Sequence, residues 1–301
     1  MQSSHWAAFQ QALNRPVFYA QGEGWMCLAY VEKGQLGTRL YAPYGPFVAH
    51  KNGFDEALKA LQQLAKQHNA VYVRVDPTGR LTEADLQTFN LRPAPKDAQP
   101  HYTWIKDLTL DESDILGEMA GSNRNLYNTA ANKGLTFAIS RDPADIKLFL
   151  PFIHEVSANT GMIPHSDAYF TTMVQTLMPR EASVLYVAYH EGQPVAASIT
   201  FDGPISRCYA HAGSAASARK LRPGNPMLVH MILDAKANGQ KEFDFYGIAP
   251  PDQPNHRWAG FTQFKQSFGG FTRAYLGTWE LPVKKLHYHA YQWAHKVKGQ
   301  R

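Results

Sequence analysis

Cysteine is scarce in this chain, and long apolar runs are missing from it. Only Cys27 and Cys208 occur among the 301 residues, and each stands within an apolar run. Neither a disulfide framework nor a multi-cysteine zinc cluster is therefore supported, and a reducing compartment is favoured. No apolar run is long enough to span a membrane, and the segment MQSSHWAAFQQAL lacks the basic start and long apolar stretch of a signal peptide. We expect a soluble, cytoplasmic protein.

Familiar catalytic patterns are also missing. The chain contains no G-x-S-x-G elbow, H-E-x-x-H pair, Walker-type loop or G-x-G-x-x-G fingerprint. Covalent serine chemistry, zinc hydrolysis and nucleotide-driven chemistry lose support accordingly. The closest histidine group, His287, His289 and His295, lacks the spacing of a closed metal cage and is better explained as a surface feature. We expect no metal and no cofactor.

The composition nevertheless supports a large folded protein. Hydrophobic residues make up 44% of 301 residues, and this length exceeds that at which a single core usually divides, so two domains are expected. The 30 basic residues outnumber the 25 acidic ones, giving a net charge of +5 that favours an anionic partner. The excess is concentrated in the segment from Lys284 to Arg301, which contains no acidic residue.

Two halves of the chain resemble each other. A strand-like run, GWMCLAYV (24–31), leads through a turn into a second strand, and SVLYVAYH (183–190) does the same. A helical pattern follows each hairpin, at 55–68 and at 226–239, and then another strand. This order, occurring twice, predicts duplication of one α/β unit, although chance similarity of two short hairpins remains an alternative.

A proline-rich segment separates the halves. LRPAPKDAQP (91–100) contains three prolines and is typical of a stiff connector. We therefore predict a first domain over 1–101 and a second over 102–276, with 277–301 as a candidate to complete the first.

One lysine stands among aromatic residues in FTQFKQSFGG (261–270). Phe261, Phe264 and Phe268 recur at helical spacing, which would leave Lys265 as a solvated residue on the helix flank, with Gly269 as the C-cap. The alternative is that a cation in this apolar setting has a functional role. The pattern alone does not separate the two interpretations.

The predicted unit is also similar to the acyl-CoA N-acetyltransferase fold. Those enzymes bind the CoA pyrophosphate at backbone N–H groups of a helix N-terminus. Here the corresponding stretch is RKLRPGNPML (219–228), where Pro223 and Pro226 remove donors. CoA is therefore not expected as a cofactor.

Seven stretches, in order along nearly the whole chain, resemble the Fem family, the non-ribosomal aminoacyltransferases that build the interpeptide bridge of peptidoglycan. These stretches are LYAPYGPFV (40–48), VRVDP (73–77), QPHYTWIKDL (99–108), RNLYNTAANKGL (124–135), YAHAGS (209–214), FDFYGI (243–248) and FTQFKQSFGG (261–270). The resemblance implies an α/β (α+β) fold of two tandem acetyltransferase-like (GNAT-like) domains with a cleft between them. Some members carry a long helical arm, but ordinary helical patterns occupy 142–180 here, so the armless form is expected.

The resemblance also implies a reaction. An amino acid would pass from aminoacyl-tRNA to the stem-peptide amine of a peptidoglycan precursor, either lipid II or UDP-MurNAc-pentapeptide. The partners would be these two substrates, the chain would act as a monomer, and peripheral contact with the inner membrane leaflet is a candidate. An acyl-CoA N-acyltransferase, or a non-catalytic module that binds lipid II or RNA, remains an alternative.

Site residues follow from the same resemblance. Phe264 and Lys265 coincide with the Phe-Lys pair of the family, which places Lys265 near the tRNA acceptor end, where a cation stabilises a developing oxyanion. Tyr169 and Tyr209 match tyrosines of the precursor site, and partly buried structural tyrosines are the alternative for each. His165 stands where the family can use an arginine to bind diphosphate, and it would bind an anion more weakly. Arg39, Arg207 and Arg219 are substitutes of low rank.

The sequence does not identify a general base. Asp76 and Asp244 stand near predicted strand ends, where an aspartate also commonly caps a turn or helix. A substrate-assisted route, in which the tRNA itself takes the proton, needs no protein base and is favoured.

Overall fold

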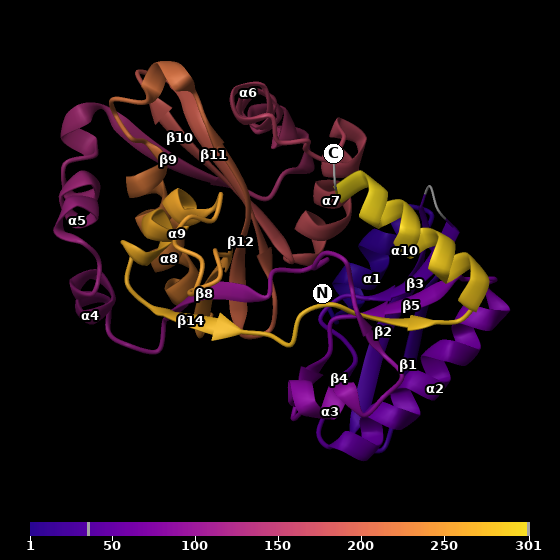
Figure 1. The fold of residues 1–301 in the computed structure, drawn as a ribbon. Helices are drawn as coiled ribbons and strands as arrows, with labels where there is room; N and C mark the ends of the chain where they lie inside the picture. Colours follow the sequence, from indigo (N-terminus) through magenta and orange to yellow (C-terminus); the bar gives the residue numbers. More distant parts are fainter. Residues whose placement is uncertain (35–36, 300–301) are drawn as a thin grey trace. The chain divides into compact units, whose positions relative to one another are not determined.

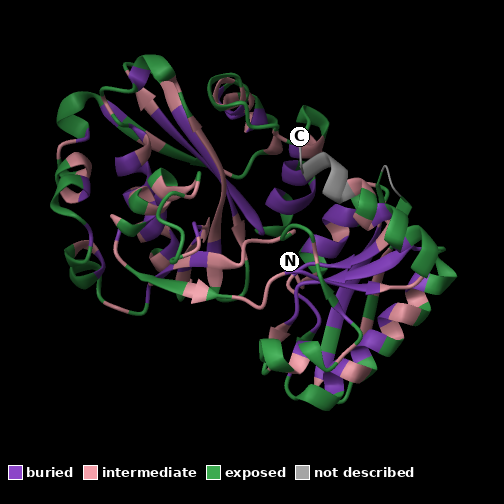
Figure 2. Ribbon diagram, in the orientation of Figure 1, coloured by how far each residue is buried: buried purple, intermediate pink, exposed green. Residues whose placement is uncertain are grey.

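The chain forms two compact units, each built around a β-sheet. The computed structural model describes residues 1–34 and 37–299, with side chains up to residue 294 within these ranges. The first unit comprises Met1–His101 and Ala274–Arg301, and the second comprises Tyr102–Arg273. Helices cover both sheets (Figure 1), and the buried residues lie mainly on the strands and on the helix sides that face them (Figure 2). The predicted α/β class is confirmed.

The first unit contains segments from both ends of the chain. Its elements are α1 (Ser4–Ala12), β1 (Val17–Gly22), β2 (Trp25–Gly34), β3 (Gly37–Ala42), β4 (Phe47–Val48), α2 (Lys51–Gln67), β5 (Tyr72–Val75), β6 (Thr78–Gly79), α3 (Glu83–Gln87), β7 (Arg92–Pro93), β15 (Trp279–Pro282) and α10 (Lys285–Gly299). The strands follow the order β6-β4-β2-β3-β5-β15-β7, and β1 pairs with β2. The segment predicted as a plain connector thus contributes the short edge strand β7, which pairs with β15.

The side chains of β5 point alternately to the two faces of this sheet, and each face is covered by a different helix. Val73 and Val75 join the core cluster that includes Leu58 and Leu61 of α2. Tyr72, directly before Val73, packs instead with Tyr288 and Tyr291 of α10. Successive side chains of a strand point to opposite faces. Helices α2 and α10 therefore cover opposite faces of the first sheet.

A buried ionic network joins the closing segment to this sheet. Glu280 of β15 is fully buried, and its carboxylate accepts hydrogen bonds from the guanidinium of Arg74, 2.5 Å away, and from the hydroxyl of Tyr288, 2.8 Å away. The hydroxyl of Tyr291 lies 2.8 Å from the same guanidinium. Removing one partner of a buried pair leaves an uncompensated charge. The first unit therefore depends on residues after 273.

The second unit is continuous in sequence. Its elements are β8 (Tyr102–Asp107), α4 (Glu112–Gly117), α5 (Gly121–Asn128), β9 (Leu135–Ser140), α6 (Leu150–Thr160), α7 (Asp167–Leu177), β10 (Ser183–His190), β11 (Gln193–Asp202), β12 (Ser206–Ser214), α8 (Gly224–Ala237), β13 (Glu242–Gly247), α9 (Ala259–Gln266) and β14 (Phe271–Ala274), with short 3-10 turns at Ala131–Lys133, Pro143–Leu148, Met178–Arg180 and Ala216–Ala218. The strand order is β14-β8-β13-β12-β11-β10-β9.

The faces of the second sheet also belong to different helices. Val184 and Tyr186 of β10 share a buried cluster with α8 residues such as Leu228 and Ile232. On the other face, α6 packs against β12, where a Cβ added to Gly213 would lie 2.8 Å from Phe152. Figure 1 shows α6 and α7 apart from α8, across this sheet. The face toward α6 and α7 carries most of the ionisable groups described below.

The two units share a topology, but not the alignment suggested by the sequence. In the first unit β3 is parallel to β5 and α2 connects them. In the second unit β12 is parallel to β13 and α8 connects them. Strands β2–β3 therefore correspond to β11–β12, whereas the similar sequence runs compare β2–β3 with β10–β11. The two similar hairpin sequences are therefore offset by one strand between the units, because the sequence of a hairpin turn does not show which strand precedes the connecting helix.

No long arm interrupts the second unit. Residues 142–180 form α6, α7 and short 3-10 turns, and the longest helix in the described part of the chain is α2, with 17 residues. The armless form predicted from the sequence is confirmed. Within the described residues, no helix is both long and apolar enough to cross a bilayer.

Candidate active site

Lys265 lies in the last turn of α9, and its side chain is buried. Only 9% of the residue is exposed, and Nζ donates a hydrogen bond to the backbone oxygen of Gly247, 2.5 Å away. Gly247 ends strand β13. The interpretation of Lys265 as a solvated residue on the helix flank is therefore wrong.

Aromatic packing holds α9 in this position. Phe268 is fully buried in the core, and the ring of Phe264 lies beside it, with centroids 5.2 Å apart. Phe261 differs, because 60% of it is exposed, so the predicted three-residue apolar stripe contains only the other two. With these two rings on the core side, the helix turns Lys265 toward the end of β13.

The two glycines after the helix allow the chain to lie directly against β8. Gly269 and Gly270 have φ values of +74° and +113°, which side chains rarely allow. A Cβ at Gly270 would lie 2.2 Å from the backbone oxygen of Ile105, and the indole N–H of Trp104 donates to the oxygen of Gly269, 2.9 Å away. The helix cap itself is Ser267, not Gly269 as predicted.

Burial moves the pKa values of a lysine and an aspartate toward neutrality. Desolvation lowers the pKa of Lys265 to about 8, and the nearby negative charge of Asp244 opposes this shift. Desolvation likewise raises the pKa of Asp244 to about 6, although its carboxylate accepts a 2.7 Å hydrogen bond from the N–H of Tyr246 and interacts with Lys265. Such paired shifts are common where proton transfer or charge stabilisation occurs.

Strand register places Asp244 in a row of side chains on one face. Asp244 is opposite Cys208 of β12 and Ile105 of β8. Residues directly opposite each other share a face, and Thr103, two residues before Ile105, shares it as well. Thr103 is fully buried, and its hydroxyl has no hydrogen-bond partner among the described residues. The row therefore combines an acid, a thiol and an unsatisfied hydroxyl near the end of β13.

A β-bulge separates Tyr209 from this face. Tyr209 is opposite Thr200, whereas His211, two residues later, is opposite Ile199. Thr200 and Ile199 are adjacent and point to opposite faces, so Tyr209 and His211 do so too. Tyr209 packs at the core cluster with α8, and burial raises the pKa of its phenol. The structure thus does not group Tyr209 with the side chains facing α6 and α7.

His165 and Tyr169 do lie together, at the start of α7. Their rings stack, with centroids 3.9 Å apart and an interplanar angle of 19°. His165 is exposed, and His211 of β12 lies 6.2 Å from it, edge to face. Burial, together with the nearby charge of His165, lowers the pKa of His211 to about 3. Of the predicted residues, His165 and Tyr169 form one group, and Lys265 and Phe264 another on α9.

The three arginines considered as alternative diphosphate ligands differ in burial and in ion pairing. Arg207 is fully buried and binds the carboxylates of Asp202, at 2.7 Å, and Asp234. Arg39 pairs with Glu32 at 2.5 Å, whereas Arg219 is exposed. Arg207 is therefore a structural ion-pair residue. Its burial agrees with the low rank given above to Arg207 as a ligand of the precursor diphosphate.

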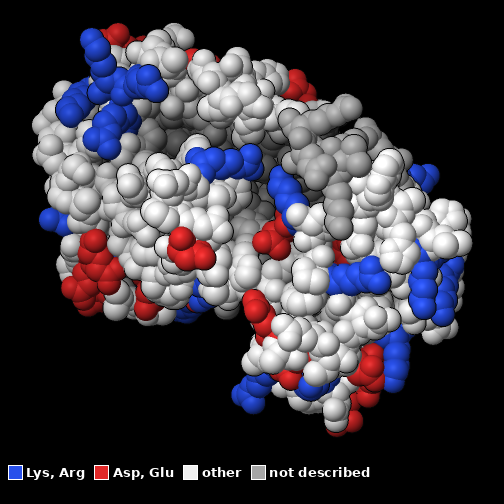
Figure 3. Space-filling model, in the orientation of Figure 1, with Lys and Arg blue, Asp and Glu red and all other residues white. Residues whose placement is uncertain are grey.

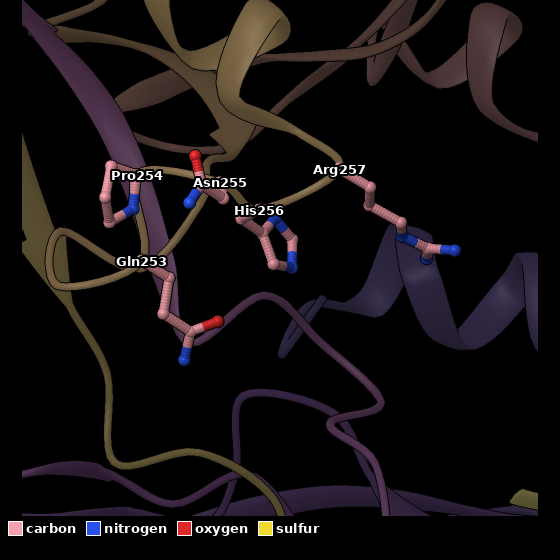
Figure 4. Close-up of a pocket in the computed structure, with 5 residues that line it drawn as sticks. All are labelled: Gln253, Pro254, Asn255, His256 and Arg257. Atoms are coloured by element: carbon pink, nitrogen blue, oxygen red, sulfur yellow. The ribbon is translucent and has the colours of Figure 1, made fainter.

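Two hollows adjoin α9. One, of about 240 Å³, is lined by residues of the loop after β13 and of α9, among them Pro250, Thr262, Gln263 and Gln266. The other, of about 570 Å³, lies along residues 253–257, and Figure 4 shows the Arg257 side chain extending away from the other four. Lys265 lines neither hollow. Within the described residues, no group of three or more His, Cys, Asp or Glu residues could hold a metal ion.

Sequence reasoning missed three groups near Lys265. The Gly247 oxygen is a backbone atom, the Thr103 hydroxyl is hidden within QPHYTWIKDL, and Cys208 was explained only by its apolar run. Their proximity arises from pairing among β8, β12 and β13. The proximity of these groups therefore becomes known only when the strand pairing is known.

Comparison with known proteins relates part of the chain to a known family. The model of the FemAB family matches residues 180–296. This segment of the chain is therefore similar to the FemAB family. The matched segment contains Tyr209, Phe264 and Lys265, whereas His165 and Tyr169 precede it. No curated protein matches the sequence of this chain.

Solved structures share the fold at low sequence identity. The crystal structure of FemX is 15% identical with a TM-score of 0.84, covering 96% of this chain and 93% of that one. The C-terminal domain of a putative lysylphosphatidylglycerol synthetase from Agrobacterium fabrum is 13% identical with a TM-score of 0.61, covering 94% and 88%. A tandem GNAT protein from the clavulanic acid biosynthesis pathway is 11% identical with a TM-score of 0.53, covering 86% and 79%. The chain therefore has the predicted tandem GNAT-like fold.

Proposed function

We propose that this protein belongs to the Fem family and transfers an amino acid from aminoacyl-tRNA to the stem-peptide amine of a peptidoglycan precursor. Lipid II and UDP-MurNAc-pentapeptide are the candidate acceptors, and the protein acts as a monomer in the cytoplasm, in peripheral contact with the membrane. The family match and the tandem GNAT-like fold support acyl transfer to an amine. The observation that carries the proposal is the buried ammonium of Lys265 in α9.

The environment of Lys265 suits a developing oxyanion. A lysine ammonium has three donors, and the structure assigns one of them, within the described residues, to the oxygen of Gly247. In the proposed reaction the other two donors would bind the developing oxyanion of the substrate. A buried cation interacts more strongly with a nearby anion than a solvated one does. Charge that develops only in the transition state is then stabilised selectively.

The reaction follows from these groups. The amine nitrogen attacks the ester carbonyl carbon, a C–N bond forms, and the carbonyl oxygen becomes an alkoxide beside Lys265. When this intermediate collapses, the bond from the carbon to the ribose oxygen breaks. The proton lost by the amine ends on that ribose oxygen. No protein base is required for this balance, and we assign none.

The other predicted residues are proposed to bind substrate. Phe264 is partly buried beside the core, and its exposed edge would contact the terminal adenine next to Lys265. His165, stacked on Tyr169, presents an imidazole and a phenol that could bind the precursor. Tyr209 is the weakest of these assignments, because its ring packs toward α8.

A transfer assay with substituted proteins tests the role of Lys265. Purified protein is mixed with a pool of charged tRNAs and a lysine-containing precursor, and the added mass identifies the donor amino acid. Lys265→Met retains length but loses the charge, and we expect kcat to fall by about 10²–10³-fold, as when an oxyanion donor is removed. Lys241→Ala, at an exposed lysine of the same unit, is the matched control. Full turnover by folded Lys265→Met protein would disprove this assignment.

A second candidate is acyl-CoA-dependent transfer, which the likeness to the tandem GNAT protein favours. The N-terminus of α8 argues against it. Pro223 and Pro226 have no N–H, and the N–H groups of Asn225 and Met227 already donate within the first turn. Few donors remain for a pyrophosphate. A rise in melting temperature with acetyl-CoA but not with precursor would support this alternative, and tight precursor binding without transfer would indicate a non-catalytic module.

A further inference from the structure

Helix α10 has two distinct sides. Tyr288 and Tyr291 are buried against the sheet of the first unit. Leu286 and Trp293 are 84% and 70% exposed. These two residues are seven apart, so they lie on the same side of the helix. Ala290, between them, is exposed as well. The helix therefore presents a second apolar stripe that is not covered within its own unit.

The exposure of this stripe is not typical of the tryptophans in the chain. Trp6, Trp25 and Trp279 are each 8% exposed, and Trp104 and Trp258 are partly buried. An exposed tryptophan aligned with an exposed leucine usually marks a contact surface.

The segment that contains the stripe carries charge of one sign. After Glu280 the sequence contains no acidic residue, and its cations are Lys284, Lys285, Lys296, Lys298 and Arg301. Lys285 is exposed at the start of α10, whereas the side chains of the last three lie outside the described residues. Figure 3 shows Lys and Arg side chains around the region where α10 begins in Figure 1. The surface therefore complements a negatively charged partner.

We propose that Leu286, Ala290, Trp293 and Lys285 form a surface by which α10 docks on an anionic membrane. Apolar side chains flanked by cations are stable at the boundary between lipid headgroups and acyl chains, where tryptophan is favoured. The phosphates of an RNA would attract the same cations, but they offer no apolar region for Leu286. The combination of both chemistries decides for the membrane.

This surface rests on the proposed function in one respect, because it would make the membrane contact included there, but it does not depend on the proposed reaction. If both are correct, docking brings the first unit to the plane in which a lipid-linked acceptor lies. Failure of membrane binding would leave the transfer assay unaffected, and failure of transfer would leave membrane binding unaffected.

Vesicle binding of the full chain tests the proposal. The vesicles contain phosphatidylcholine alone or with phosphatidylglycerol, and co-sedimentation measures binding. We expect binding only to the anionic vesicles, weakening with added salt, and a blue shift of tryptophan fluorescence. Trp293→Phe should remove most of the shift while retaining binding.

Substitutions in α10 separate the two contributions. Leu286→Ala combined with Trp293→Ala should weaken partitioning at least about tenfold, because two large apolar side chains are lost. Lys285→Gln should weaken it about fivefold. The matched controls are Ile205→Ala, at an apolar residue 58% exposed in the second unit, and Lys66→Gln, at an exposed lysine of α2. Both controls should bind as the unaltered chain does.

Three results would overturn the proposal. The first is equal vesicle binding by the unaltered chain and the double variant, with melting temperatures showing that both are folded. The second is loss of tRNA binding in the double variant without any vesicle binding by the unaltered chain, which would indicate an RNA surface. The third is a dimer that the double variant dissociates, which would indicate a second copy of the chain.

Discussion

Lys265 and Asp244 influence each other's charge. Each is desolvated, and each is the opposite charge that partly offsets the desolvation of the other. The protonated form of Lys265 is the form that would stabilise an oxyanion, and its pKa of about 8 places the loss of that form just above neutral pH. In the proposed reaction Asp244 would then be a positioning residue, because it would act through the lysine.

Asp244→Asn is expected to shift the pH dependence of kcat. Without the carboxylate, desolvation alone acts on Lys265, and the pKa of the ammonium falls further. Activity that declines as pH rises through about 8 in the unaltered protein should therefore decline at lower pH in the variant. The measurement is kcat against pH, with Asp252→Asn, at an exposed aspartate, as the control. An alkaline limb at the same pH in both variants would show that Asp244 does not act on Lys265.

The turn between α9 and β14 positions the helix that carries the lysine. Gly270 has a φ of +113°, and a Cβ there would collide with the backbone of β8. The indole of Trp104 and the oxygen of Gly269 add a hydrogen bond at the same place. This turn fixes the position of α9 relative to the end of β13, and it thereby fixes the location of the Lys265 ammonium.

Gly270→Ala should destabilise the second unit by at least about 2 kcal/mol, from backbone strain and the collision with Ile105. Gly117→Ala is the matched control, because a Cβ at Gly117, the last residue of α4, meets nothing within 4 Å. The control should change stability by no more than about 1 kcal/mol. Chemical denaturation followed by circular dichroism gives both values. Equal stability of the two variants would contradict this account of the turn.

At the scale of the whole molecule, the first unit is discontinuous in sequence. Strand β15 lies between β5 and β7, and Glu280 pairs with the largely buried Arg74. The second unit, Tyr102–Arg273, contains its own sheet and core. The two units should therefore respond differently to loss of the closing segment.

Removal of residues 274–301 should unfold the first unit. It opens an edge on β5 and leaves Arg74 without its carboxylate, and an unpaired buried charge costs about 3–5 kcal/mol. Limited proteolysis should then cut within 1–101 and spare 102–273. A chain ending at Val283 retains β15 and Glu280, so it should be cut more slowly. Equal protection of both units after the longer truncation would show that the closing segment is dispensable.

The sequence by itself determined the repeated α/β pattern, the resemblance to the Fem family and the pairing of Phe264 with Lys265. Periodicity, turns and motif order are local properties, so they survive in a linear reading of 261–270 or 183–190. It also predicted α2, α8 and the short helices between 142 and 180. The alignment of the repeats was displaced by one strand, because pairing between distant strands is not a local property.

Only the tertiary structure decided whether Lys265 is solvated or buried, because the burial of this residue depends on which side of α9 packs against the core. The same holds for Tyr209 and His211, whose faces are set by a bulge, and for the residues opposite Asp244. These facts arise from strand register and side-chain packing between segments far apart in the chain. The sequence shows which side chains are ionisable, whereas the fold determines how far each of them is exposed to solvent.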